Sequence, residues 1–190
     1  AGVSLLRDEE SELLMPRLPK KRKTQGQQAA RIDANAPVPT IQQIGDLAWA
    51  GQHATAIELA TTAVAASRLS VADRLDLLDL RAESLVAVGD LERAGADAAA
   101  MLDLANAARS AALKAQAQNR LAVVQLRNDE SRAALATATA ALKTARQSKQ
   151  SSLIAMSLLR LSEAQIWELL SEPAIRTATQ AATLFRSMAQ

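Results

Sequence analysis

The sequence predicts an all-α protein, and three observations carry that prediction. First, 43 of the 190 residues are Ala and 28 are Leu, both strong helix formers. Second, only 2% of the residues are aromatic, so the side chains that usually fill a pleated sheet are scarce. Third, apolar residues recur at helical spacing from Thr40 onward, in stretches that short turns separate. We therefore expect helices throughout the folded part and no sheet.

Residues 1–39 are predicted to form a leading segment of their own. Residues 4–15 have the pattern of a short helix that Ser4 caps and Pro16 ends. Four of the five Pro residues lie between positions 16 and 39, together with the basic tetrad Lys20–Lys23, which is typical of an extended linker. The tetrad suits a nuclear address, a phosphate-binding patch or a solvated stretch of linker.

Residues 40–190 are predicted to form a helical domain, and its first four helices begin and end at local signals. A capping box opens the first helix, because a hydroxyl and a Gln side chain stand three residues apart. Gly residues, which adopt the left-handed conformation without penalty, separate the helices of each pair. We expect helices over 41–50, 53–67, 71–88 and 91–105. Their signals are Thr40 with Gln43, Gly51, Ser70 with Asp73, Gly89 and Asp90.

The remaining four helices are expected over 110–127, 129–148, 152–170 and 172–190. We place the turn of the third pair at Asn128, which tolerates the left-handed conformation, and expect Asp129 to cap the next helix. Ser171 is expected to cap the last helix. Pro173 is acceptable there because the amides of a first turn have no partner within the helix.

The helix pairs repeat along the sequence. With turns at Gly51, Gly89, Asn128 and Leu169, the spacing is 38, 39 and 41 residues. Small residues recur after each turn, and small residues on one face let stacked helices approach closely. Five, nine and twelve residues after the turns stand Ala56, Ala94, Ala133 and Ala174; Ala60, Ala98, Thr137 and Ala178; and Ala63, Met101, Ala140 and Ala181.

The turns Gly51–Ala56 and Gly89–Ala94 resemble the Gly-Asp-Tyr-x-x-Ala turn of the tetratricopeptide repeat. The resemblance covers residues 40–190 as four repeats, and it implies a right-handed α-solenoid of about four antiparallel helix pairs. The repeats exceed the usual 34 residues, and Leu47, Leu85 and Val124 replace the expected aromatics. The long form is similar to repeat regions of bacterial signalling proteins, where they follow nucleotide-cyclase, ATPase or transcription-regulator domains. Armadillo or HEAT-type repeats are the structural alternative.

The composition argues against an enzyme. Without Cys there is neither a disulfide nor a thiolate site, and the single His53 cannot supply the His pair that catalytic zinc usually takes. No phosphate-binding loop, dinucleotide fingerprint or nucleophile elbow occurs. We predict a non-catalytic module that binds a protein or peptide, with no cofactor and no metal. The alternative is a ligand-sensing regulatory domain of a larger bacterial signalling protein.

The resemblance implies that the first helix of each pair lines a binding groove. Asp76, Asp79 and Glu83 share one side of such a helix, so the groove is expected to suit a basic peptide. A solvated face and a metal site are the alternatives for these carboxylates. Trp49 and Trp167 are interpreted either as packing residues or as hot spots for a partner. The residues expected at related places in the other repeats are Trp49, Gln118, Ala122, Gln125, Glu163 and Trp167.

Two further predictions concern partners. Tetratricopeptide proteins that bind acidic chaperone tails use a clamp of Lys, Arg and Asn. Here Asn119 and Arg120 are the nearest candidates, so we expect no such binding. The last helix, with Phe185 and Met188, lacks a polar cap and can dock another domain or a second copy, giving a homo-oligomer through the terminal repeat.

The charge distribution is uneven along the chain. The net charge is −6 over residues 40–105 and +6 over residues 106–190, while the overall excess of +2 comes from residues 1–39. Such polarity can steer association, although solvated surfaces explain it equally well, and it gives no argument for nucleic acid. We expect no membrane segment and a cytoplasmic location, because neither a long apolar run nor a secretory signal occurs. A start at Ala1 and Gly2 suggests a piece of a larger protein.

Overall fold

The computed structural model describes residues 40–65 and 68–189, and this part of the chain contains eight α-helices and no strand. The predicted short helix over residues 4–15, the linker and the tetrad Lys20–Lys23 lie outside the described residues. The all-α prediction is confirmed. The helices are α1 (Ile41–Trp49), α2 (His53–Val64), α3 (Val71–Val88), α4 (Leu91–Ala107), α5 (Ala111–Arg127), α6 (Ser131–Ser148), α7 (Ser151–Trp167) and α8 (Ser171–Met188).

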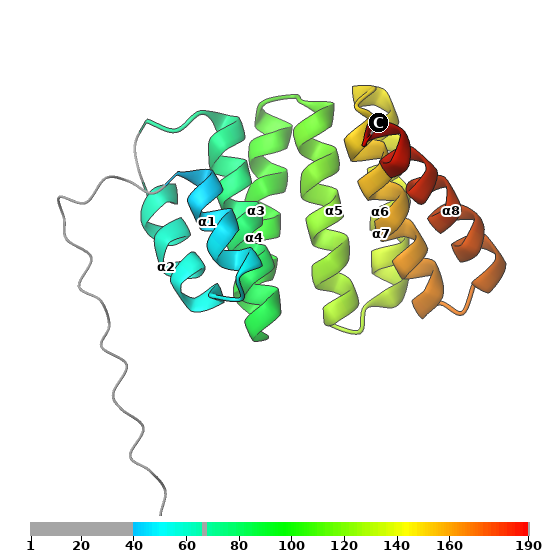
Figure 1. The fold of residues 1–190 in the computed structure, drawn as a ribbon, viewed down its shortest axis with the longest axis horizontal. Helices are drawn as coiled ribbons and strands as arrows, with labels where there is room; N and C mark the ends of the chain where they lie inside the picture. The colour runs from blue at the N-terminus through cyan, green and yellow to red at the C-terminus, as the bar shows by residue number, and fades with distance from the viewer. Residues whose placement is uncertain (1–39, 66–67, 190) are drawn as a thin grey trace, which may run out of the picture. The chain divides into compact units, whose positions relative to one another are not determined.

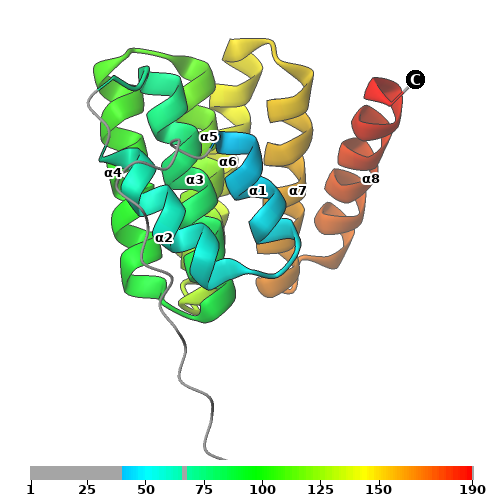
Figure 2. The ribbon, with the colours of Figure 1, turned by 60° about the vertical axis from the view of Figure 1, so that its left-hand side comes forward.

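The helices form an elongated solenoid of four antiparallel pairs. Each helix packs on the next along the chain (Figures 1 and 2). The first helices of the pairs also contact one another in order, α1 with α3, α3 with α5 and α5 with α7, and we call them the first-helix layer. No such contacts join α2, α4, α6 and α8, the second-helix layer. The first helices therefore lie closer to one another than the second helices do, which places the first-helix layer on the inner side of the array.

Side-chain caps explain where four of the helices begin. In each case the side chain of the N-cap residue accepts a hydrogen bond from the backbone N–H three residues on, satisfying an amide that the helix leaves without a partner. At the start of α1 the predicted capping box is complete, because the Gln43 side chain also accepts from the Thr40 N–H at 2.9 Å. The caps are Thr40, Ser70, Asp90 and Ser110, at 3.2, 3.0, 3.3 and 3.3 Å.

The predicted turn of the third pair is wrong by one residue. Asp129, with φ +59°, adopts the left-handed conformation, whereas Asn128 has φ −89°. Glu130 is the N-cap of α6 and makes no side-chain cap, so Asp129 does not cap the helix. Both Asn and Asp tolerate the left-handed region, so local chemistry does not distinguish the two positions. The left-handed residues at the turns within the four pairs are thus Gly51, Gly89, Asp129 and Leu169, spaced by 38, 40 and 40 residues.

The corrected register brings the small residues of α6 into the core. Ala133, which the sequence placed in the first small row, is exposed, whereas Ala134 is fully buried. Every residue of the three corrected rows is buried except Ala178, which is half-buried. The rows are Ala56, Ala94, Ala134 and Ala174; Ala60, Ala98, Ala138 and Ala178; and Ala63, Met101, Ala141 and Ala181.

The start of α8 also differs from the prediction. Leu170 is the N-cap and makes no side-chain hydrogen bond, while Ser171 is already the first helical residue and caps nothing. Pro173 lies in the first turn, as expected. The preceding Leu169 has φ +59°, a conformation that is strained for a residue with a branched side chain. The turn therefore forms without the polar or glycine residues that favour it elsewhere in the chain.

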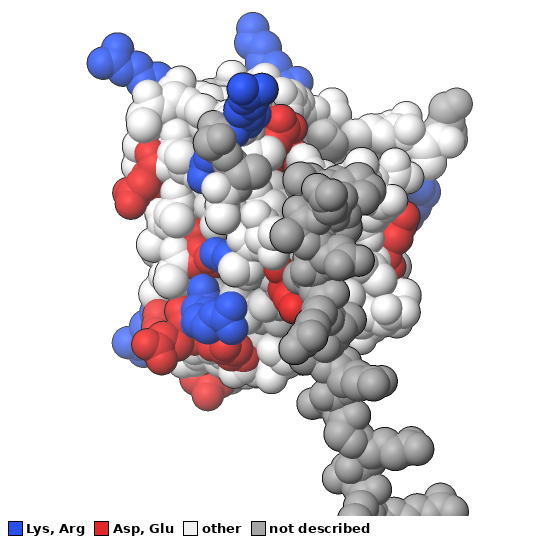
Figure 3. Space-filling view, turned by 90° about the vertical axis from the view of Figure 1, so that its left-hand side faces the viewer, with Lys and Arg blue, Asp and Glu red and all other residues white. Residues whose placement is uncertain are grey.

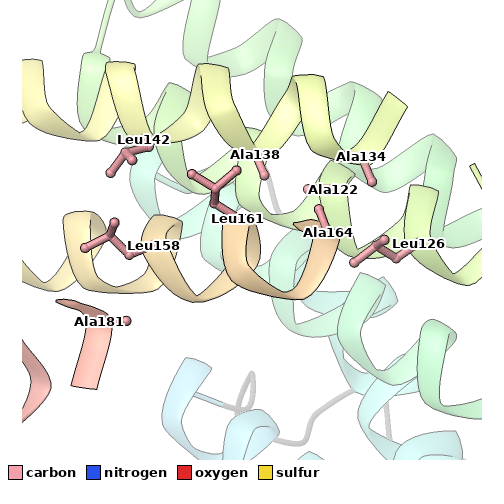
Figure 4. Close-up of a cluster of buried hydrophobic side chains, with 9 residues drawn as sticks. All are labelled: Ala122, Leu126, Ala134, Ala138, Leu142, Leu158, Leu161, Ala164 and Ala181. Carbon is pink, nitrogen blue, oxygen red and sulfur yellow. The ribbon is translucent and has the colours of Figure 1, made fainter. Parts of the chain in front are cut away.

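The core combines large side chains with the rows of Ala. In the cluster shown in Figure 4, Leu142 of α6 lies across from Leu158 and Leu161 of α7, and Ala138 fills the space beside them. Large residues opposite small ones allow dense packing without voids. The distance between neighbouring helices is therefore set by the Ala rows as much as by the Leu side chains.

None of the described helices is both long enough and apolar enough to cross a bilayer.

Candidate functional site: the first-helix layer

The three predicted acidic residues of α3 do lie together, but they are joined to α5. The Gln116 amide donates hydrogen bonds to Asp76 at 2.9 Å and to Asp79 at 3.2 Å. The Arg120 guanidinium donates from Nε to Asp79 and from Nη2 to Glu83 at 3.1 Å. We call these five residues the α3–α5 network. It links consecutive members of the first-helix layer, so the carboxylates have a structural role at the same time as any role in binding.

Arg120 lowers the negative charge of this network. Its side chain is only 11% exposed. Burial alone would lower its pKa, but the attraction and hydrogen bonds of Asp79 and Glu83 outweigh that effect and raise the pKa above the ordinary arginine value. The guanidinium therefore stays charged and offsets one of the three carboxylates, which leaves the network with a formal net charge of −2. That the network binds a basic peptide stays a prediction.

The structure does not bring the predicted residues of α5 to the network. Ala122 is fully buried in the core. Gln118 lines a hollow in the second-helix layer, and Gln125 is half-buried with its Oε1 lacking a hydrogen-bond partner among the described residues. With a 40-residue register from the caps Ser70 and Ser110, the equivalents of Asp76, Asp79 and Glu83 are instead Gln116, Asn119 and Val123.

The two Trp residues are exposed at the ends of first helices. Trp49 ends α1 and is 91% exposed, so the packing interpretation is wrong there. Trp167 ends α7 and is 54% exposed. A large aromatic side chain in water costs free energy that a partner can recover by covering it. At the α1–α2 end of the array, which faces the viewer in Figure 3, the visible charges have both signs and do not gather into one patch.

Trp167 and Glu163, both predicted as site residues, line one pocket between α5 and α7. The pocket holds about 220 Å³. Arg160 donates from Nη1 to both carboxylate oxygens of Glu163, at 3.0 and 2.9 Å, so a paired charge lies beside the aromatic ring. We call this site the Trp167 pocket, and its lining residues are Val123, Leu126, Arg127, Arg160, Glu163 and Trp167.

An exposed apolar surface adjoins the Trp167 pocket at the turn between α7 and α8. Leu169 is 87% exposed and Ile175 is 66% exposed, values that are unusual for large aliphatic residues. Contiguous exposed apolar residues mark interaction surfaces. This patch was not predicted from the sequence, although the apolar pair Leu169 and Leu170 at a turn was a signal for it. We call it the α7–α8 patch: Ile166, Trp167, Leu169, Leu170 and Ile175.

The terminal helix carries further apolar surface, as the sequence predicted. Phe185 and Met188 of α8 are both exposed. Among the described helices only α7 packs on α8. The last helix thus has exposed apolar residues at its C-terminal end in addition to Ile175 near its start.

Comparisons with known proteins identify the fold alone. No family model matches the chain, and no curated protein sequence matches it. Among solved structures, the chain is similar to the apo form of RapI, with a TM-score of 0.65 and 13% sequence identity. The match covers 83% of this chain and 60% of RapI, so the chain spans less than two thirds of that protein. The likeness and the eight-helix array together support a helical repeat fold of the tetratricopeptide type.

Proposed function

We propose that residues 40–190 are a non-catalytic interaction module that binds a peptide or protein partner at the Trp167 pocket and the α7–α8 patch. One observation carries the proposal: a half-exposed Trp and a paired Arg line a single hollow, and exposed aliphatic residues stand beside this Trp in the chain, at the turn into α8. Trp and Arg are enriched among residues that dominate binding energies, and such residues gather in pockets within an apolar surface. A partner with an apolar side chain fits this hollow.

The backbone at Leu169 supports the same site. A left-handed Leu costs about 1–3 kcal/mol, and at the equivalent turns the chain places Gly51, Gly89 and Asp129. This strain exposes an aliphatic side chain where a Gly or Asp would expose none. Strained residues cluster at functional sites, which supports a partner site at this turn.

Truncation of Trp167 tests the proposal. Peptides are selected from a random phage-displayed library on the wild-type protein, and their affinities are then measured by fluorescence anisotropy. We expect Trp167→Ala to weaken binding by about tenfold or more, since removal of a hot-spot Trp usually costs over 1 kcal/mol. Trp49→Ala is the matched control, because it removes an even more exposed Trp from the other end of the array.

Two results would contradict this site. One is that Trp167→Ala binds the selected peptides as tightly as the wild-type protein does. The other is that Trp49→Ala and Trp167→Ala weaken them equally, which would indicate nonspecific adhesion to exposed aromatics.

Self-association through the terminal repeat is part of the same proposal. The α7–α8 patch and the exposed residues of α8 are free to meet a second copy. We expect analytical ultracentrifugation at low salt and high concentration to detect a reversible dimer, which Ile175→Asp weakens by placing a charge in the apolar contact. A strict monomer under those conditions would contradict self-association and leave peptide binding untouched.

The alternative function is a ligand-sensing regulatory domain of a larger signalling protein of the nucleotide-cyclase, ATPase or transcription-regulator kind. A cationic hollow in the second-helix layer favours this alternative, because its lining suits a small charged ligand better than a peptide side chain.

A further inference from the structure

Three hollows in the second-helix layer are equivalent by repeat. Because the second helices do not touch one another, each successive pair leaves a space with a first helix as its floor. We call them the first hollow (α2, α3 and α4), the middle hollow (α4, α5 and α6) and the last hollow (α6, α7 and α8). Their volumes are about 500, 440 and 370 Å³.

The 40-residue register allows their linings to be compared position by position. At one floor position stand Leu78, Gln118 and Leu158 of the first, middle and last hollow, so only the middle hollow has a polar side chain at that position. One wall position follows the same rule, and a second is polar in all three hollows but changes in charge. The first of these wall positions holds Leu104, Thr144 and Leu184 in the first, middle and last hollow. The second holds Asp103, Lys143 and Thr183 in the same order.

The middle hollow is also cationic without a compensating acid. Arg109, Lys114 and Lys143 line it, and no Asp or Glu does. Among the described residues none of these three cations forms an ion pair or donates a hydrogen bond, whereas six arginines elsewhere are paired with carboxylates. Three like charges around one cavity repel one another, and an anion between them removes that repulsion.

Gln118 adds an independent sign of a ligand. Its Oε1 is buried and has no hydrogen-bond partner among the described residues, which costs free energy unless a group entering the hollow binds it. The two ends of the amide can exchange places, so Gln118 can accept from a ligand or donate to one. Ser110 and Ala111 place the start of α5 at the same cavity, where the helix dipole favours negative charge.

We infer that the middle hollow binds a small polar molecule with at least two negative charges. Arg109, Lys114 and Lys143 would hold its phosphoryl or carboxyl groups, and Gln118 would hydrogen-bond its polar body. A volume of about 440 Å³ lies within the range of small-molecule sites. The residues that line the middle hollow belong to neither the Trp167 pocket nor the α7–α8 patch, so the site is distinct from the proposed partner site.

The inference is tested by isothermal titration calorimetry of the full chain in low-salt buffer, with pyrophosphate and citrate as probes. We expect saturable one-site binding of at least one probe. Pyrophosphate alone would identify phosphoryl chemistry, and citrate alone would identify carboxyl chemistry. Lys143→Asp places in the middle hollow the residue found in the first hollow, and we expect it to weaken binding by about tenfold or more.

Two further variants make the test specific. Arg186→Asp changes the net charge by the same amount on exposed α8, and we expect affinity to remain within about twofold of wild type, because distant exposed charges are screened. Gln118→Leu copies the floor of the other two hollows, so it should fold normally while losing affinity. No saturable binding of either probe, or equal losses in Lys143→Asp and Arg186→Asp, would overturn the inference. Trp167→Ala should leave the titration unchanged, which separates this site from the proposed partner site.

Discussion

Asp97→Ala is expected to lower the free energy of unfolding by about 3–5 kcal/mol, the cost of leaving a buried charge without its partner. Arg81 of α3 donates to both carboxylate oxygens of Asp97 of α4, at 2.8 and 2.6 Å, and to Thr61 of α2 at 3.1 Å. The side chains of Arg81 and Asp97 are only 16% and 7% exposed. Urea unfolding followed by circular dichroism would measure the loss.

In Asp97→Ala, Arg81 cannot reduce the loss of stability by giving up its proton. In the wild-type protein the hydrogen bond to Asp97 is the main cause of the raised pKa of Arg81, and together with the Coulomb attraction it exceeds the lowering effect of burial. Asp97→Ala removes both contributions, but the ordinary pKa of an arginine lies so far above neutral pH that the guanidinium stays charged. A base with a raised folded pKa contributes its full stability below its unfolded pKa and loses it only as the pH rises through the folded value. For an arginine that window lies far above neutral pH. The deficit in Asp97→Ala should therefore be the same at pH 6 and pH 8.

The next repeats provide a matched control for this pair. At the positions 40 and 80 residues after Arg81 the chain has Leu121 and Leu161, and after Asp97 it has Thr137 and Thr177. The double variant Arg81→Leu/Asp97→Thr removes both charges together, and we expect it to lie within about 1 kcal/mol of wild type. Equal destabilisation of the single and double variants would show that shape, rather than an unpaired charge, determines the loss.

Ala134→Leu is expected to cost about 1–3 kcal/mol of stability, because the new side chain must enter a packed interface. Ala134 is fully buried, in the row of small residues that sets the spacing of the helices. Its neighbour Ala133 is exposed, and Ala133→Leu should change stability by less than about 0.5 kcal/mol. Urea unfolding of the two variants compares the same substitution one residue apart.

This comparison also tests the register of the third helix pair. If the turn lay at Asn128, Ala133 would occupy the buried row and the two variants would exchange their effects. A larger loss in Ala133→Leu than in Ala134→Leu would therefore contradict the left-handed turn at Asp129. The far-ultraviolet spectrum controls for loss of helix, since both sites are in α6.

Local signals were sufficient to predict most helix boundaries. The hydroxyl and carboxylate caps at Thr40, Ser70 and Asp90 act within three residues, and Gly51 and Gly89 favour the left-handed turn through their own backbone freedom. Such effects can be read from a short stretch of sequence. At residues 128 and 129 two permissive side chains stood side by side, and the packing of α6 decided between them.

The candidate site could be predicted only in part. Glu163 and Trp167 lie four residues apart near the end of one helix, so their common pocket follows from helical spacing. The pairing of Asp79 with Arg120 spans 41 residues and depends on how α3 stacks on α5. Gln118 lies on the expected helix α5 but on another face of it, at the middle hollow, because a register error of about half a turn moves a residue across a helix.

Composition, helical spacing and local caps by themselves determined that this chain folds as stacked antiparallel helix pairs, because those preferences act between residues close in the sequence. The exposure of Trp49, the apolar α7–α8 patch and the unpaired cations of the middle hollow were decided only by the tertiary structure. Each of these depends on which side chains from separate repeats reach the same space. That choice follows from the stacking of whole helices and is visible only once they are packed.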